Sequence, residues 1–189
     1  MINLNEKSAK AMFDIREGFK VWKKGRALII RSSRTITDGM HRYLLEDLVD
    51  MRPKSVLDIG CGDGRLLLRF AKNKRFWGAE LYGIDRDEKA LLLAKKRLKG
   101  FEVSLSKGKS IKIPFHRKFD LIVTTNSYHE WEDKEKCIYK ILGKLNAKGS
   151  FVIYDTLPLN MQRFKHKYRG IKPEVTRIAP IAKIRFAID

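Results

Sequence analysis

From residue 55 to residue 154, short apolar segments alternate with amphipathic ones, and this alternation restricts the possible folds more than any other feature. Strands that alternate with helices in this way predict βαβ units and a parallel sheet. Right-handed crossovers then give an open α/β fold, a doubly wound and mostly parallel sheet whose ligand site lies at the carboxyl ends of the strands. The expected strands are 55–59, 81–85, 101–105, 120–124 and 150–154, and the expected helices are 64–73, 87–99 and 133–145.

The segments on either side of this core predict further elements. Apolar residues at helical spacing indicate a helix over 6–24 and a second over 37–51, with Thr37 or Asp38 as its cap, while 27–37 stays ambiguous. The last 34 residues predict a short helix and one or two edge strands. We expect one compact domain, in which 1–52 form an N-terminal helical lid over a Rossmann-like domain of residues 53–189.

The strongest local motif is the segment VLDIGCGDG, residues 56–64, between the first expected strand and its helix. Its glycines permit a tight turn and a close backbone approach to a ligand. Asp85 ends the next strand, about twenty residues on, where a carboxylate can accept hydrogen bonds from ribose hydroxyls. Asp58 lies inside the strand, beside the turn, where it suits a cationic group and disfavours a pyrophosphate. This pattern favours S-adenosylmethionine over a nicotinamide dinucleotide as the cofactor.

Four segments in this order resemble the class I, Rossmann-like S-adenosylmethionine-dependent methyltransferases, over about half of the chain. VLDIGCGDG is similar to their first motif, and Asp85 to the acid that closes their second strand. KFDLIVTTNSYHEWED (118–133) resembles the fourth-strand segment of small-molecule and ubiquinone-biosynthesis-like members, and ILGKLNAKGSFVIYD (141–155) resembles their helix, turn and fifth strand. The resemblance implies that the cofactor is S-adenosyl-L-methionine.

The resemblance also implies a role for individual side chains in binding that cofactor. The methionine part would lie against the glycine turn with its amino group near Asp58, and Asp85 would hold the ribose. Asn126 would touch the methionine end or the acceptor. The expected cofactor-binding residues are Asp58, Gly60, Cys61, Gly62, Asp85, Arg86, Lys109, Ser110 and Asn126.

One position departs from the family pattern. The segment GKSIKIPF (108–115) is similar to a family segment whose acid usually receives the adenine amino group, and Lys109 stands at that acid's position. A lysine only donates hydrogen bonds, so it cannot receive that amino group. Either Ser110 and nearby backbone groups contact the adenine, or the alignment shifts at this point.

Few residues are candidates for the chemistry. His129, beyond the fourth expected strand, could accept a proton from the acceptor, and the alternative is a histidine packed beside Trp131. Arg31 and Arg34 are candidate partners for the cofactor carboxylate or for an anionic acceptor. The only cysteines, Cys61 and Cys137, have no metal-ligand spacing, so no metal site is expected. No apolar run long enough for a membrane span and no secretory leader occurs, so we expect a cytoplasmic protein.

The charge balance keeps a second function open. Lysines and arginines number 41 against 22 acids, a net charge of +19, and residues 95–118 alone carry nine basic residues and one acid. Such an excess favours RNA or another phosphate-rich partner, and the alternative is a solvated basic surface. Residues 159–172 interleave basic and aromatic residues, which suits a nucleic-acid strand, or equally a surface helix with its aromatic residues in the core.

Three hypotheses therefore remain. The first is a methyltransferase acting on a small molecule, and the second is an RNA methyltransferase that uses the basic surface. The third is a non-catalytic S-adenosylmethionine-binding partner protein, which Lys109 suggests. The segment Asn126-Ser127-Tyr128 lacks the prolines found after the fourth strand of enzymes that methylate nucleobase amino groups, which weakens that form of the second hypothesis. The acceptor, the atom methylated and the oligomeric state are left open.

Overall fold

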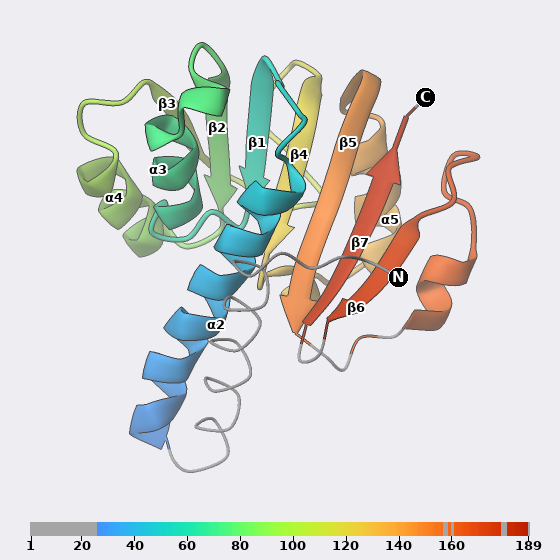
Figure 1. Ribbon diagram of the computed structural model, residues 1–189, viewed down its shortest axis with the longest axis horizontal. Helices are drawn as coiled ribbons and strands as arrows, with labels where there is room; N and C mark the ends of the chain where they lie inside the picture. The colour runs from blue at the N-terminus through green and yellow to red at the C-terminus, as the bar shows by residue number, and fades with distance from the viewer. Residues whose placement is uncertain (1–25, 157–158, 160, 179–180, 189) are drawn as a thin grey trace.

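The computed structural model describes residues 26–156, 159, 161–178 and 181–188, and for 26–35, 161–162 and 178 it describes the backbone only. A seven-stranded sheet with the order β3-β2-β1-β4-β5-β7-β6 forms its centre (Figure 1). The first five strands run parallel, and β7 pairs antiparallel with both β5 and β6. The strands are β1 (Ser55–Ile59), β2 (Glu80–Asp85), β3 (Val103–Lys107), β4 (Phe119–Thr125), β5 (Leu145–Thr156), β6 (Glu174–Ile178) and β7 (Ile181–Ala187).

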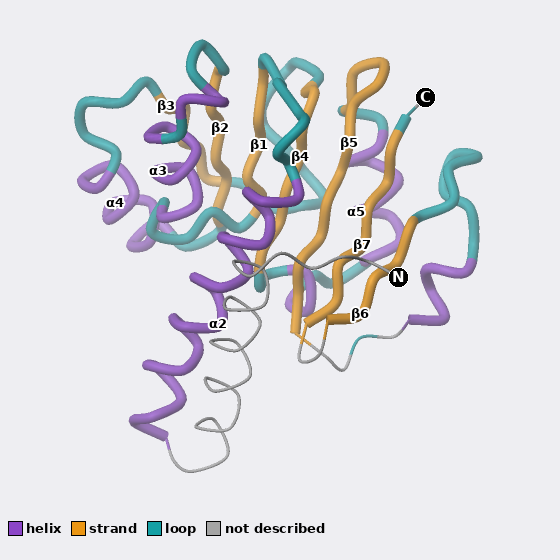
Figure 2. The backbone as a smooth tube through the Cα atoms, viewed as in Figure 1, coloured by secondary structure: helices purple, strands orange, loops and turns teal. Residues whose placement is uncertain are grey.

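Helices cover both faces of this sheet (Figures 1 and 2). One apolar cluster joins the sheet to α2 (Arg26–Asp47), α3 (Arg65–Lys72) and α4 (Glu88–Arg97). A second cluster joins the opposite face to α5 (Lys134–Leu142), and Phe164 and Tyr168 are buried in it. Short 3-10 helices follow three of the elements: Lys74–Phe76, Tyr128–Glu130 and Met161–Lys165. The doubly wound α/β prediction is confirmed.

The strands and helices of the central segment lie within a few residues of their predicted positions. The third strand lies at Val103–Lys107 rather than 101–105, because Gly100 and Phe101 still belong to the turn that ends α4. The fifth strand begins at Leu145 rather than Ser150. Its first residues pair with β4 across a register shift, and Lys148 adopts a φ of 60°, so the expected turn is an irregularity within a longer strand.

The N-terminal prediction was partly wrong. The helix predicted over 37–51 is α2, which already begins at Arg26 and ends at Asp47, so Thr37 and Asp38 lie inside it and do not cap it. Residues 27–37 continue the same helix, and from Ile36 onward its apolar face, with Met40 and Leu44, packs against the sheet. The helix predicted over 6–24 lies outside the described residues.

Polar contacts near the carboxyl end of α2 join this helix to strands β5 and β7. The hydroxyl of Tyr154 on β5 donates to Oδ2 of Asp47 at 2.9 Å, and Lys183 on β7 forms an ion pair with the same carboxylate. His41 contacts β4 through Thr125. These contacts bring α2 across the carboxyl ends of β4 and β5, next to the glycine turn.

Candidate cofactor site and active site

The glycine turn after β1 is held by the end of β2. The amides of Gly60 and Cys61 both donate to the carbonyl of Ile84, at 2.8 and 3.0 Å, and the amide of Gly62 donates to Oδ2 of Asp85 at 2.7 Å. Gly60 has a φ of +77°, and a Cβ there would lie 2.2 Å from the hydroxyl oxygen of Ser127. Only glycine therefore fits at position 60, and the Asp85 carboxylate helps to set the shape of the turn.

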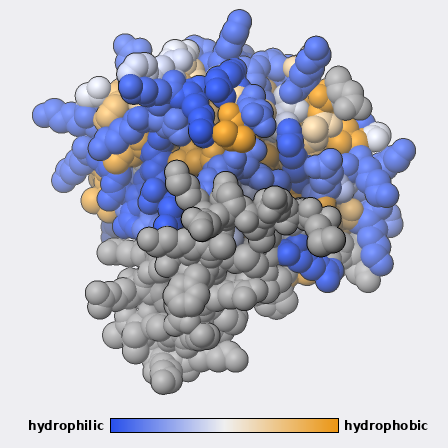
Figure 3. All heavy atoms as spheres, in the orientation of Figure 1, coloured by the Kyte–Doolittle hydropathy of each residue, from blue (hydrophilic) through white to orange (hydrophobic). Residues whose placement is uncertain are grey.

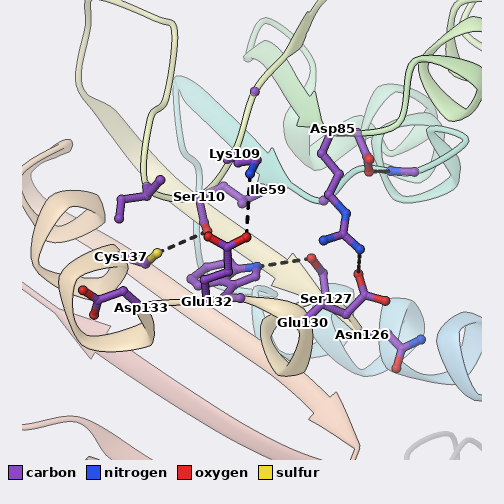
Figure 4. A pocket seen from close by; sticks show the side chains of 16 residues that line it. Ile59, Asp85, Lys109, Ser110, Asn126, Ser127, Glu130, Glu132, Asp133 and Cys137 are labelled. Carbon is purple, nitrogen blue, oxygen red and sulfur yellow. Dashed lines mark hydrogen bonds and ion pairs between the residues drawn. The ribbon is translucent and has the colours of Figure 1, made fainter.

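A cavity opens on the β2 side of this turn (Figure 4). The segment 108–111 forms one wall, held by a hydrogen bond from the amide of Gly108 to the carbonyl of Asp85 at 3.0 Å. Two ion pairs join the walls: Arg86 with Glu130 at 3.0 Å, and Lys109 with Glu132 at 3.7 Å. The predicted residues that line this cavity are Gly60, Gly62, Asp85, Arg86, Lys109, Ser110 and Asn126.

A second cavity lies on the other side of the turn, beneath α2. It is lined by Thr37 and His41 from the helix, by Thr125 and Asn126 from the end of β4, and by Asp58, Gly60, Cys61, Gly62, Asp63, Arg65 and Leu66 from the turn and its flanks. Gly60, Gly62 and Asn126 line both cavities. One elongated ligand can therefore contact both cavities along the turn.

Asp58 gives the second cavity its chemical character. Its side chain is 1% exposed, and its Oδ1 has no hydrogen-bond partner among the described residues. Burial, with a smaller contribution from the charge of Asp85, raises the pKa of the Asp58 carboxyl to about 8. A buried carboxylate without a partner is unfavourable unless a donor or cation completes it. The ammonium of a methionine-derived cofactor is such a group, so these residues fit S-adenosylmethionine.

The structure brings all nine predicted cofactor residues into these two cavities. Their individual roles stay predictions. Lys109 is 61% exposed and faces Glu132, whereas the Ser110 hydroxyl lies 3.3 Å from the sulfur of Cys137. Cys61 is buried, and burial raises the pKa of its thiol, which argues against a nucleophilic role.

His129 lines neither cavity and has a carboxylate as its partner. Its Nδ1 lies 2.9 Å from Oδ1 of Asp155, and its backbone amide donates to Oδ2 of the same residue at 2.9 Å. Asp155 is fully buried, while the His129 side chain is 43% exposed. The hydrogen bond to Asp155 is the largest cause of a raised pKa of His129. The ring is thus oriented by Asp155, and Trp131 packs on Tyr128 with ring centroids 5.3 Å apart.

Some predictions fall outside these contacts. The side chains of Arg31 and Arg34 lie outside the described part of the chain. Within the described residues, no cluster of histidine, cysteine or acidic side chains could hold a metal ion. The same residues include no helix that is both long and apolar enough to cross a membrane.

Sequence reasoning missed two residues. His41 enters the second cavity from a helix outside the recognised motifs, and no local signal pointed to it. Asp155 lies near the carboxyl end of β5, Asn126 directly follows β4, and adjacent parallel strands bring their carboxyl ends together. That adjacency could have paired Asp155 with the segment that contains His129.

Comparisons with known proteins agree with this geometry. The profile of the methyltransferase-domain family matches residues 51–177. Demethylmenaquinone methyltransferase of Thermotoga maritima is 32% identical over 143 residues, which cover 71% of this chain and 59% of that protein. An uncharacterized methyltransferase of Bacillus subtilis is 30% identical over 115 residues, which cover 60% of this chain and 62% of the relative. The chain thus spans about three fifths of the length of these two relatives.

Solved structures show the same fold at lower sequence identity. The plantazolicin methyltransferase BpumL, in complex with a triazolic desmethylPZN analog and SAH, has a TM-score of 0.66 and 16% identity, covering 97% of this chain and 98% of that one. The N-methyltransferase NodS from Bradyrhizobium japonicum has a TM-score of 0.63 and 20% identity, covering 79% of this chain and 94% of that one. With the family profile matched over most of the chain and the fold in place, the chain belongs to the class I S-adenosylmethionine-dependent methyltransferases.

Proposed function

We propose that this chain transfers a methyl group from S-adenosylmethionine to a small-molecule acceptor whose oxygen or nitrogen carries a proton. The observation that carries this proposal is the adjacency of two features at one edge of the sheet. The two cavities flank the glycine turn there, and the His129–Asp155 pair lies at the carboxyl ends of β4 and β5.

The cofactor supplies, when bound, a methyl carbon on a cationic sulfur, which keeps the electron pair of the broken carbon–sulfur bond. The residues of the chain bind this cofactor and remove a proton from the acceptor. Asp85 would hold the ribose, Asp58 would hold the ammonium, and residues 108–111 would line the place of the adenine. Because Asp155 only accepts hydrogen bonds, Nδ1 of His129 carries the proton and Nε2 is the basic nitrogen. Nε2 would accept the proton of the acceptor's hydroxyl or amine.

The names of two relatives support a small-molecule acceptor, because demethylmenaquinone and desmethylPZN analogs are not nucleic acids. The two aromatic residues of 159–172 that favoured RNA binding cannot stack on bases, because Phe164 and Tyr168 are each 3% exposed and pack in the core. Within 95–118, four basic residues form ion pairs with acids of the same chain, namely Arg97, Lys107, Lys109 and Arg117.

RNA methylation remains the second candidate because the described part of the face in Figure 3 is largely hydrophilic and Lys95, Lys96 and Lys99 on or beside α4 are exposed. Strongly salt-dependent RNA binding would favour it, and no binding at about 50 mM salt would count against it. Cofactor binding without turnover in any extract would favour the non-catalytic hypothesis. We further propose that residues 1–52 act as a lid, and a cytoplasmic location stays a prediction.

The decisive experiment follows labelled methyl groups from S-adenosylmethionine into a fractionated cell extract, with RNase and protease controls. We expect label in the low-mass fraction. Asp85→Ala should strongly reduce it at limiting cofactor, and Glu88→Gln, which changes an exposed carboxylate three residues along the chain, should not. Label that disappears with RNase would instead support the RNA hypothesis.

A further inference from the structure

Helix α2 places a second unpartnered polar atom in the cavity beneath it. His41 is 4% exposed, and its Nδ1 has no hydrogen-bond partner within the described part of the chain. Oδ1 of Asp58, on the sheet side of the same cavity, is in the same condition. Two buried polar atoms without partners, on residues that line one cavity from different elements, indicate a polar ligand between α2 and the turn.

The ring of His41 is held in one orientation and in one charge state. Its Nε2 lies 3.1 Å from the hydroxyl oxygen of Thr125, at the end of β4. Burial is the main cause that lowers the pKa of His41 to about 4, so the imidazole is neutral at physiological pH. Because the threonine hydroxyl can donate or accept, Nδ1 of the neutral ring can accept from an ammonium or donate to a carboxylate.

The charged residues of the cavity lining are Asp58, Asp63 and Arg65, and they offer groups of both signs, as the ammonium and carboxylate of an amino acid require. Asp58 supplies an acceptor for an ammonium, and Arg65 at the start of α3 supplies a cation for a carboxylate. The Arg65 guanidinium lies 3.2 Å from Asp63 and 3.9 Å from Asp38, which keeps it at the cavity wall. The nucleoside has its own wall on the other side of the turn, formed by Asp85 and residues 108–111.

We infer that His41 is a specificity-determining residue that binds the amino-acid end of the cofactor from helix α2, opposite Asp58. This inference rests on the proposed cofactor site. The sheet and its loops then bind the nucleoside, whereas the helix that precedes the first strand contributes to recognition of the amino acid. A ligand without the amino-acid end gains nothing from His41.

Two ligands separate these contributions. S-adenosylhomocysteine carries both the nucleoside and the amino acid, whereas 5′-methylthioadenosine carries the nucleoside and the sulfur alone. We would measure the affinity of the full chain for each ligand by calorimetry, for the wild type, His41→Phe, Asp58→Asn and Asp85→Ala. Thermal unfolding of each variant and its affinity for 5′-methylthioadenosine report whether the site is still folded.

We expect His41→Phe and Asp58→Asn to weaken S-adenosylhomocysteine binding by about tenfold or more, because a hydrogen bond to a charged group is lost. Both should bind 5′-methylthioadenosine like the wild type, whereas Asp85→Ala should weaken both ligands. Unchanged S-adenosylhomocysteine affinity in His41→Phe, or an equal loss for both ligands, would overturn the role of His41. If the wild type binds neither ligand, the proposed function itself fails.

Discussion

The imidazole of His129 and the carboxylate of Asp155 form a hydrogen-bonded pair at 2.9 Å, in which one partner is fully buried and the other reaches solvent. The amide of Thr156 donates to the same carboxylate at 2.7 Å, and the amide of His129 completes the set. Asp155 is thus held in place by backbone groups. Its position fixes which nitrogen of His129 is protonated, and Nε2 lies 3.9 Å from Oε1 of Glu130.

This pair predicts how activity depends on pH. Because the hydrogen bond to Asp155 raises the pKa of His129 above its usual 6.5, kcat/KM should rise with pH through that raised pKa, as the basic form of Nε2 appears. The contribution of the charged His129–Asp155 pair to the free energy of unfolding changes with pH in the opposite direction. It is complete below pH 6.5 and is lost as pH rises through the raised pKa of His129. Asp155→Asn should shift the kinetic profile to lower pH. An NMR titration of His129 that gives the same pKa in both proteins would contradict the assignment.

Asp85→Ala should weaken binding of S-adenosylhomocysteine by at least tenfold while the protein stays folded. Asp85 lines the first cavity, on the β2 side of the glycine turn. Its two oxygens also accept hydrogen bonds from the amides of Gly62 and Asp87, at 2.7 and 2.9 Å. The variant loses a ligand contact and part of the order of the turn. Calorimetry tests this, with circular dichroism as the check on folding, and wild-type affinity in the variant would rule out the assignment.

Binding of S-adenosylhomocysteine should release a proton from Asp58 near neutral pH. The pKa of this carboxyl is about 8 in the free protein, because the group is buried, and a bound ammonium would lower it. Affinity should therefore increase as pH rises toward 8. Binding enthalpies measured in buffers of different ionisation enthalpy give the number of protons released. We expect no release with 5′-methylthioadenosine or in Asp58→Asn.

Gly60→Ala should destabilise the protein more than Gly62→Ala. Both residues have a positive φ, which costs about 1–2 kcal/mol for a residue with a Cβ. Only at Gly60 would the new Cβ also collide with Ser127, since nothing lies within 4 Å of a Cβ at Gly62. Chemical denaturation measures both losses. Ser127→Gly in the Gly60→Ala background should recover part of the lost stability, and no recovery would show that the collision is relieved in another way.

The central sheet could be predicted because its signals are local. The strands β1, β2 and β4 are short and largely apolar runs, and the glycine turn and Asp85 identify the edge at which the cofactor site is predicted. The extension of α2 back to Arg26 and the true length of β5 could not be predicted in this way: the sequence of 27–37 has no clear helical pattern, and the first residues of β5 are ordered by pairing with β4.

The site shows the same division. Sequence motifs predict the nine cofactor-binding residues, and all nine line the two cavities. His41 depends on a contact with Thr125, 84 residues further along the chain, and no pattern within α2 encodes that contact. Asp155 depends on the pairing of β4 with β5.

Helix α2 contacts the sheet through residues that are distant in the chain, and this has a consequence for local unfolding. Asp47 meets Tyr154 across 107 residues, and the only sheet partner of His41 among the described hydrogen bonds is Thr125. A transient opening of α2 would uncover the sheet face on which Ile36, Met40 and Leu44 pack, and would remove one wall of the second cavity. Any ligand held there must in turn protect the amides of α2 from hydrogen exchange, so the helix reports occupancy at a distance from the nucleoside.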